Sequence, residues 1–268
     1  MPPGEADAAT ESDMTSTFRL PEGTTTAATV ATVIHVATAT VQRAGEPIEL
    51  SWRERELMAA VAAQSRPVST EVLAGLLYPD RADDDSARMV KVYVYRLRQR
   101  VSSDFIVRRD GGYSIGPYVE IDLAQAQRII EQLSQKDSLL DESQRGYAIE
   151  LARELRYDSP VALLGSEWWP AVARRARRLG YELAMSIGWN ALRKGAYRVA
   201  HSVARDVTYE DPTYEEAWEV LIRAELSLGE QAAAFRNFRC YETMLAQELE
   251  LVPSAHIRKL VYDARDVA

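Results

Sequence analysis

The segment "SARMVKVYVYRLRQRV", residues 86–101, decides the fold that we expect for this chain. Five of its sixteen residues are basic and none is acidic, although the whole 268-residue chain carries a formal net charge of -8. Four apolar residues spaced four, three and four apart share one face of a helix: Val90, Val94, Leu97 and Val101. A second stripe consists of Arg88, Lys91, Tyr95 and Arg98. The spacing predicts a helix that packs its valine face on a core and collects its positive charge on the opposite side.

The flanking segments predict two shorter helices before this one and a hairpin after it. "SWRERELMAAVAAQ" begins with Ser51 and has Glu54 three residues later, which is a capping box. "STEVLAGLLY" predicts a second helix capped by Ser69, and "FIVRRDGGYSIG" predicts two strands around a Gly-Gly turn. Alternating β-branched residues from about 26 to 50 predict a small antiparallel sheet. The order sheet, three helices and hairpin is that of a winged helix-turn-helix, whose third helix enters DNA.

From residue 117 onward the pattern is helical, with almost no strand signal. Two helices are expected at about 123–134 and 142–156. Gly195 and Gly229 are 34 residues apart, a period typical of tetratricopeptide repeats. We therefore expect a mainly α chain with a small β part, in three parts. They are a disordered tail (1–22), a winged helix-turn-helix domain (23–116), and an all-α tetratricopeptide-like domain (117–268).

The basic residues favour double-stranded DNA as the partner. Residues 86–113 contain seven positive and two negative side chains, a local charge of +5. The residues expected to face bases in the major groove are Lys91, Val92, Tyr95 and Arg96. Those expected near the phosphate backbone are Arg88, Tyr93, Arg98 and Arg100, and the hairpin contributes Arg108 and Arg109 to an adjacent minor groove. The alternative is a solvated basic face, with one of the two tyrosines covering the edge of the core.

Composition and motifs favour neither an enzyme nor a membrane protein. The three histidines are isolated, and the sequence contains no metal-binding, nucleophile or phosphate-loop motif, so no cofactor, metal or catalytic residue is expected. Residues 24–41 are too rich in threonine for a membrane span. A single cysteine, Cys240, and the absence of a cationic leader favour a soluble protein of the cytoplasm.

Four segments of the winged region resemble the Streptomyces antibiotic regulatory protein (SARP) family of transcriptional activators: "RERELMAAVA", "RPVSTEVLAGLLY", residues 86–101 and "VRRDGGYSI". "GSEWWPAVARRARRL" and residues 232–260 are similar to the bacterial transcriptional activator domain that follows in that family. The resemblance implies an activator that binds promoter direct repeats as a homodimer and contacts RNA polymerase. By position, Arg88, Lys91, Arg96 and Arg98 correspond to DNA contacts of OmpR-type domains. Tyr95 and Tyr78 depart from the family pattern, so the target sequence does not transfer.

The role of the second domain stays open between several interpretations. A stack of helix pairs forms a concave surface that suits a protein or peptide. Self-association is the preferred hypothesis, and a small ligand in the helical groove is the alternative. Trp168 and Trp169 are either exposed contact residues or buried packing residues, and arginines 174, 175, 177 and 178 either bind a partner or are solvated. A further hypothesis is an interaction adaptor whose winged domain does not bind DNA.

Overall fold

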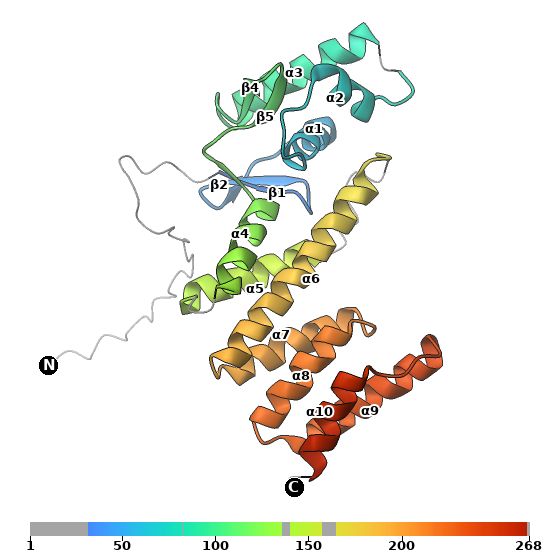
Figure 1. Ribbon diagram of the computed structural model, residues 1–268. Coiled ribbons are helices and arrows are strands. Elements are labelled where there is room, and N and C mark those ends of the chain that lie inside the picture. Colours follow the sequence, from blue (N-terminus) through green and yellow to red (C-terminus); the bar gives the residue numbers. More distant parts are fainter. Residues whose placement is uncertain (1–31, 82, 136–139, 157–164, 267–268) are drawn as a thin grey trace, which may run out of the picture.

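The computed structural model describes residues 32–81, 83–135, 140–156 and 165–266. The strands β1–β5 and helices α1–α3 lie together at one end, and α4–α10 form a stack of helices that extends away from them (Figure 1). The mainly α architecture with a small β part agrees with the prediction. The predicted tail, residues 1–22, lies outside the described residues.

A four-stranded sheet has the order β3-β2-β1-β6. β1 (Thr32–His35), β2 (Thr40–Arg43) and β3 (Glu46–Pro47) form the predicted antiparallel part. β6 (Val119–Ile121) pairs with β1 in parallel, and the prediction of helix alone after residue 117 was wrong here. Three residues are too few to display an alternating pattern, and their strand conformation depends on a partner far away in the sequence. This pairing attaches the helical part directly to the first strand.

Helices α1 (Trp52–Ala62), α2 (Thr70–Leu77) and α3 (Asp84–Arg100) form the predicted three-helix arrangement. The expected caps at Ser51 and Ser69 are confirmed. α3 begins two residues earlier than the quoted segment, because the carboxylate of its cap, Asp83, accepts the backbone N–H of Ser86 at 2.9 Å. The four apolar residues of the predicted face are all buried, at 2% exposure or less: Val90, Val94, Leu97 and Val101.

β4 (Ile106–Arg109) and β5 (Gly112–Ile115) form the predicted hairpin. The turn lies at Asp110 and Gly111, which have φ of +47° and +78°, so the predicted Gly-Gly turn is displaced by one residue. Gly112 belongs to β5, and a Cβ there would lie 2.8 Å from the carbonyl of Val68. Glycine is needed at 112 for the close approach of two backbones.

The helical part follows the predicted repeats. Its helices are α4 (Asp122–Ser134), α5 (Glu142–Arg156), α6 (Trp169–Arg193), α7 (Tyr197–Glu210), α8 (Glu215–Ser227), α9 (Gln231–Glu248) and α10 (Ala255–Asp266). Gly195 and Gly229 lie in the turns α6–α7 and α8–α9, with φ of +73° and +77°. Gly188 lets α8 approach α6, since a Cβ there would lie 3.0 Å from a methyl of Val220. The 34-residue period therefore corresponds to two helical hairpins. Trp169 is buried, as expected for a packing residue, and Trp168 is half-buried.

Contacts at α1 and β1 join the winged region to the helical part. The Ser166 hydroxyl donates to Glu56, whose side chain is only 2% exposed. Arg175 donates to the carbonyl of Ala63 at the end of α1 (3.2 Å). On the other side of the junction, His35 of β1 contacts Glu154 of α5. These contacts leave the outward side of α3 exposed.

Candidate nucleic-acid interface

The exposed side of α3 and the hairpin form what we call the cationic face. Its six residues are all exposed: Arg88, Lys91, Tyr95, Arg96, Arg108 and Arg109. The buried valine face orients this side outward, so the same 3.6-residue period that builds the core also collects the charges. Tyr95 is 63% exposed, so its ring is available to a partner that docks on this face. Among the described residues, α3 packs on α1, α2 and β4, at the end of the molecule far from α7–α10 (Figure 1), and the six side chains of the cationic face are exposed.

Two further predicted DNA contacts have partners inside the protein. Arg98 is half-buried, and its Nε donates to the carbonyl oxygen of Ile106 in β4 at 2.8 Å. Arg100 extends in another direction, with its Nε 3.2 Å from Oε1 of Glu54 in α1. Both arginines therefore support the surface: Arg98 connects the hairpin to α3, and Arg100 connects α3 to α1.

Glu54 is a buried acid that the sequence identified only as a helix cap. Burial alone would raise the pKa of Glu54. Hydrogen bonds from Ser51, together with the charges of Arg100 and Arg96, hold that pKa below its ordinary value. The carboxylate is therefore charged at neutral pH and anchors the last turn of α3 electrostatically.

Val92 and Tyr93 lie at the margin of the cationic face and are half-buried. Burial, followed by a hydrogen bond with Tyr93, raises the pKa of Tyr78 to about 12. The guanidinium of Arg96 lies 5.7 Å from the centre of the Tyr93 ring. Tyr93 therefore covers the core edge and supports Arg96, while Tyr95 is the exposed tyrosine of the pair.

One acid beside the cationic face was not identified from the sequence. Glu71 of α2 is fully exposed, and the pKa of its carboxyl is lowered by hydrogen bonds from its own backbone N–H and from Ser69, with smaller contributions from Lys91 and Arg108. A charged acid at this edge marks the boundary of the positive surface. Its signal in the sequence was weak, because an exposed glutamate in the first turn of a helix is common.

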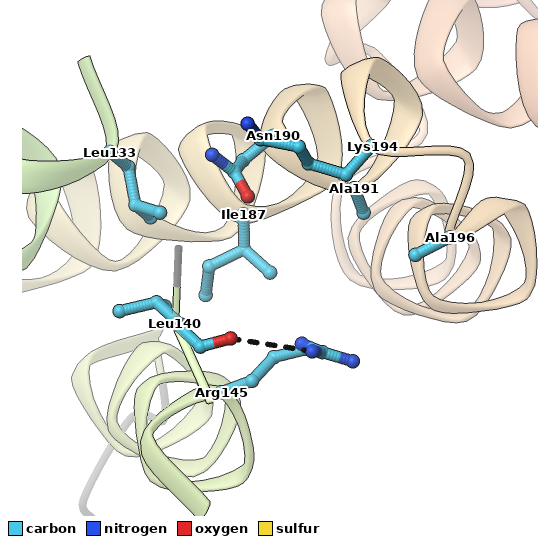
Figure 2. A pocket seen from close by; sticks show the side chains of 8 residues that line it. All are labelled: Leu133, Leu140, Arg145, Ile187, Asn190, Ala191, Lys194 and Ala196. Carbon is cyan, nitrogen blue, oxygen red and sulfur yellow. Dashed lines mark hydrogen bonds between the residues drawn. The ribbon is translucent and has the colours of Figure 1, made fainter. Parts of the chain in front are cut away.

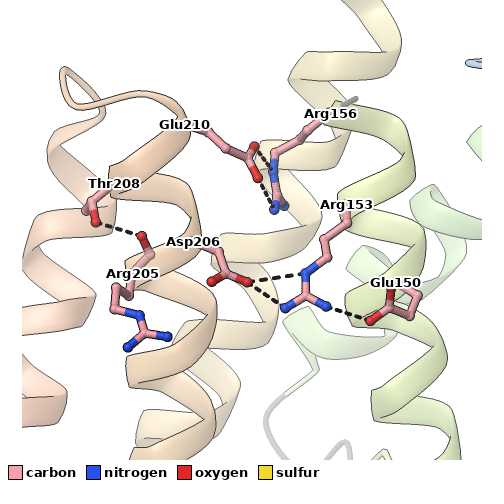
Figure 3. A network of polar contacts seen from close by, with 7 residues as sticks. All are labelled: Glu150, Arg153, Arg156, Arg205, Asp206, Thr208 and Glu210. Atoms are coloured by element: carbon pink, nitrogen blue, oxygen red, sulfur yellow. Dashed lines mark hydrogen bonds and ion pairs between the residues drawn. The ribbon is translucent and has the colours of Figure 1, made fainter. Parts of the chain in front are cut away.

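The helical part offers surfaces of a different character. A small cavity between α4, α5 and α6 has apolar walls and the cations Arg145 and Lys194 at its edge (Figure 2). Nearby, Arg153 and Arg156 of α5 bind Asp206 and Glu210 of α7 at 2.6 and 2.7 Å (Figure 3). These ion pairs join neighbouring helix pairs and are structural.

The described residues show no arrangement that suits a metal. No three His, Cys, Asp or Glu side chains come together there to hold an ion. Each histidine contacts a glutamate instead: the pairs are His35–Glu154, His201–Glu225 and His256–Glu219. Within the same residues, no helix has the length and apolar character of a membrane span.

Comparisons with known proteins agree with this architecture. Residues 121–263, more than half of the chain, match the family described as "Bacterial transcriptional activator domain". A stretch of 82 residues is 35% identical to the TorCAD operon transcriptional regulatory protein TorR of Escherichia coli. That stretch covers 30% of this chain and 36% of TorR, so the chain spans about a third of that relative.

A solved structure is similar over most of the chain. Mycobacterium tuberculosis EmbR in complex with a low affinity phosphopeptide has a TM-score of 0.66 and 17% sequence identity, covering 89% of this chain and 65% of that one. The likeness supports the fold: a winged region followed by a helical domain, as in SARP-like regulators. The chain belongs to the bacterial transcriptional activator domain family.

Proposed function

We propose that this protein is an activator that recognises double-stranded promoter DNA through α3 and the β4–β5 hairpin. The observation that carries the proposal is the exposed cationic face opposite a fully buried valine face on one helix. A major groove admits one helix, and arginine or lysine on such a helix can bind guanine edges there. The charges are therefore concentrated where a bound duplex would meet them.

The side chains divide into three roles in this proposal. Lys91, Tyr95 and Arg96 face the bases, with Val92 beside them for a thymine methyl group. Arg88 binds phosphate at the start of the helix, and the hairpin arginines, Arg108 and Arg109, bind phosphate or the adjacent minor groove. The residues with internal partners support the surface: Tyr93, Arg98 and Arg100.

The helical domain would hold two protomers together on direct repeats and present a surface to RNA polymerase. Tandem sites place two copies side by side, which favours a homodimer on DNA. We place the boundaries at 1–22, 23–116 and 117–268, with β6 returning to pair with β1. The protein would act in the cytoplasm, where promoter DNA is found.

The test is the selection of genomic DNA fragments by the purified protein, followed by affinity measurements on the enriched sequence at two salt concentrations. DNA binding through the cationic face predicts an enriched motif and an affinity that falls steeply with salt as counterions are released. Lys91→Ala should weaken binding, whereas Arg239→Ala, which removes an exposed arginine from α9, should not. An adaptor with no DNA target would enrich no motif and would bind DNA weakly at both salt concentrations.

A further inference from the structure

The cationic face has little internal charge compensation. Among the described residues, none of the ion pairs involves Lys91, Arg96, Arg108 or Arg109. Arg88 has one exposed partner, Asp85, at 3.7 Å. Glu71 and Glu54 interact with these cations only through space, so the exposed positive charge of this surface can still attract a negatively charged chain that reaches it.

The sequence before β1 is negatively charged. Residues 1–31 contain five acids and one arginine, a side-chain charge of -4. Four of the acids form two pairs near the start of the chain: Glu5 with Asp7, and Glu11 with Asp13. Each pair brings two negative charges close together in the sequence, opposite in sign to the cationic face.

The first described residue, Thr32, lies on the same side of the winged region as the end of α3. Thr32 lies opposite Arg43 in the β1–β2 pair. Arg43 donates a hydrogen bond of 3.0 Å to the carbonyl of Val101, immediately after α3. From Thr32 back to Asp13 the chain can extend about 60 Å, and α3 is about 25 Å long. The acids can therefore reach every residue of the cationic face.

We propose that the acidic segment, residues 5–13, binds the cationic face of its own chain when DNA is absent, and competes with DNA for it. The occupant is a negatively charged peptide that is part of the same protein, and the interface is electrostatic. The inference rests on the proposed function for its biological meaning. The binding of the segment to α3 is a separate physical event that can be measured without DNA.

The expected size follows from competition for a single surface. A short tether gives its ligand an effective concentration in the millimolar range. Contacts between a few exposed charges give a weak intrinsic affinity, so the segment should occupy the face for much of the time, not all of it. The observed DNA affinity scales with the fraction of molecules whose cationic face is unoccupied. DNA should therefore bind the native chain about three- to tenfold more weakly than a chain whose cationic face is always unoccupied. The factor should be the same for cognate and random DNA, because the segment must leave in both cases.

The experiment uses the full chain with a neutral segment: Glu5→Gln, Asp7→Asn, Glu11→Gln and Asp13→Asn together. A matched control changes the net charge by the same amount at four exposed acids in the helical part: Glu131, Glu167, Glu248 and Glu250, each to Gln. Affinity for cognate and random duplexes is measured at about 50 mM and about 300 mM salt, which brackets the range where exposed charges become screened. In parallel, NMR compares the backbone amide shifts of α3 and the hairpin in the three proteins without DNA.

The proposal predicts that the neutral-segment protein binds both duplexes about three- to tenfold more tightly than the native chain at low salt. At high salt the gain in affinity should be less than about twofold. The control should gain less than about twofold at either salt concentration. Amide shifts should change in α3 and the hairpin only when residues 5–13 are neutralised. Equal gains in both variants, or unchanged shifts on α3, would overturn the proposal. If no protein binds DNA but the shifts change, the segment binds as proposed and the proposed function fails instead.

Discussion

Arg98→Met separates a supporting arginine from one that contacts DNA. Methionine keeps most of the apolar length of the side chain but removes the donor. In the structure this donor binds the carbonyl of Ile106 at 2.8 Å. Gly116 donates to Phe105, so by the alternation of an antiparallel pair the carbonyl of Ile106 points away from β5 and depends on Arg98.

The cost follows from the burial of that carbonyl's residue. Ile106 is fully buried, and an acceptor left without a partner in such a place costs about 1–3 kcal/mol. The loss of stability should be largest in the hairpin, because its strands are short and Arg98 links them to α3. DNA binding should weaken by a similar factor on every sequence, since a displaced hairpin changes the position of Arg108 and Arg109 without changing which bases α3 meets.

Amide hydrogen exchange is the assay, combined with thermal unfolding and DNA affinity. We expect faster exchange in β4 and β5, a lower melting temperature, and equal losses of affinity on cognate and random duplexes. Unchanged exchange and stability, together with a loss confined to the cognate site, would refute this reasoning and make Arg98 a direct base contact.

Three other substitutions test different parts of the account. Arg96→Ala should leave stability within about 0.5 kcal/mol but cost about 1–3 kcal/mol of affinity on the cognate site, and a profile over single-base variants should show relaxed specificity at one position. Glu54→Ala removes the helix cap and the partner of Arg100, and should lower the unfolding free energy in urea by about 1–2 kcal/mol or more; an unchanged midpoint would contradict the role given to Glu54. Burial raises the pKa of Glu225 to about 7 from an unfolded value near 4.5, so the stability that its protonated form contributes is complete below about pH 4.5 and is lost as the pH rises through about 7. Glu225→Gln should therefore raise the melting temperature at pH 8 and leave it nearly unchanged at pH 4.5, and an equal shift at both would show that the buried charge is not the cause.

The elements with local signals could be predicted from the sequence. Capping residues and the 3.6-residue period depend on residues within a few helical turns, and the 34-residue repeat relates two consecutive helical hairpins. The helices that these signals indicate are present. β6 could not be predicted, because its three residues adopt a strand conformation only by pairing with β1. The turn of the hairpin was displaced by one residue, since both Asp-Gly and Gly-Gly suit a turn with two left-handed residues and the sequence does not say which pair forms it.

The candidate site shows the same division between local and tertiary information. The helical period correctly placed Arg88, Lys91 and Tyr95 on the exposed side of α3, because it depends only on the spacing of the buried valines and leucine, but Arg98 of the same predicted stripe is half-buried. The internal partners of Arg98 and Arg100 were beyond the sequence, because both bonds connect α3 to segments that only the fold brings near. Whether an arginine of α3 faces solvent or binds another part of the protein therefore depends on the tertiary fold, even among arginines that are close together in the sequence.

The central claim is that α3 meets DNA with the side that carries Tyr95. The most direct measurement replaces an exposed tyrosine by a photo-crosslinking phenylalanine analogue, once at Tyr95 and once at Tyr209 of α7, which is 89% exposed. After irradiation with the selected duplex, the protein labelled at position 95 should become covalently attached to DNA and the one labelled at 209 should not. Attachment at 209 without attachment at 95 would contradict the account.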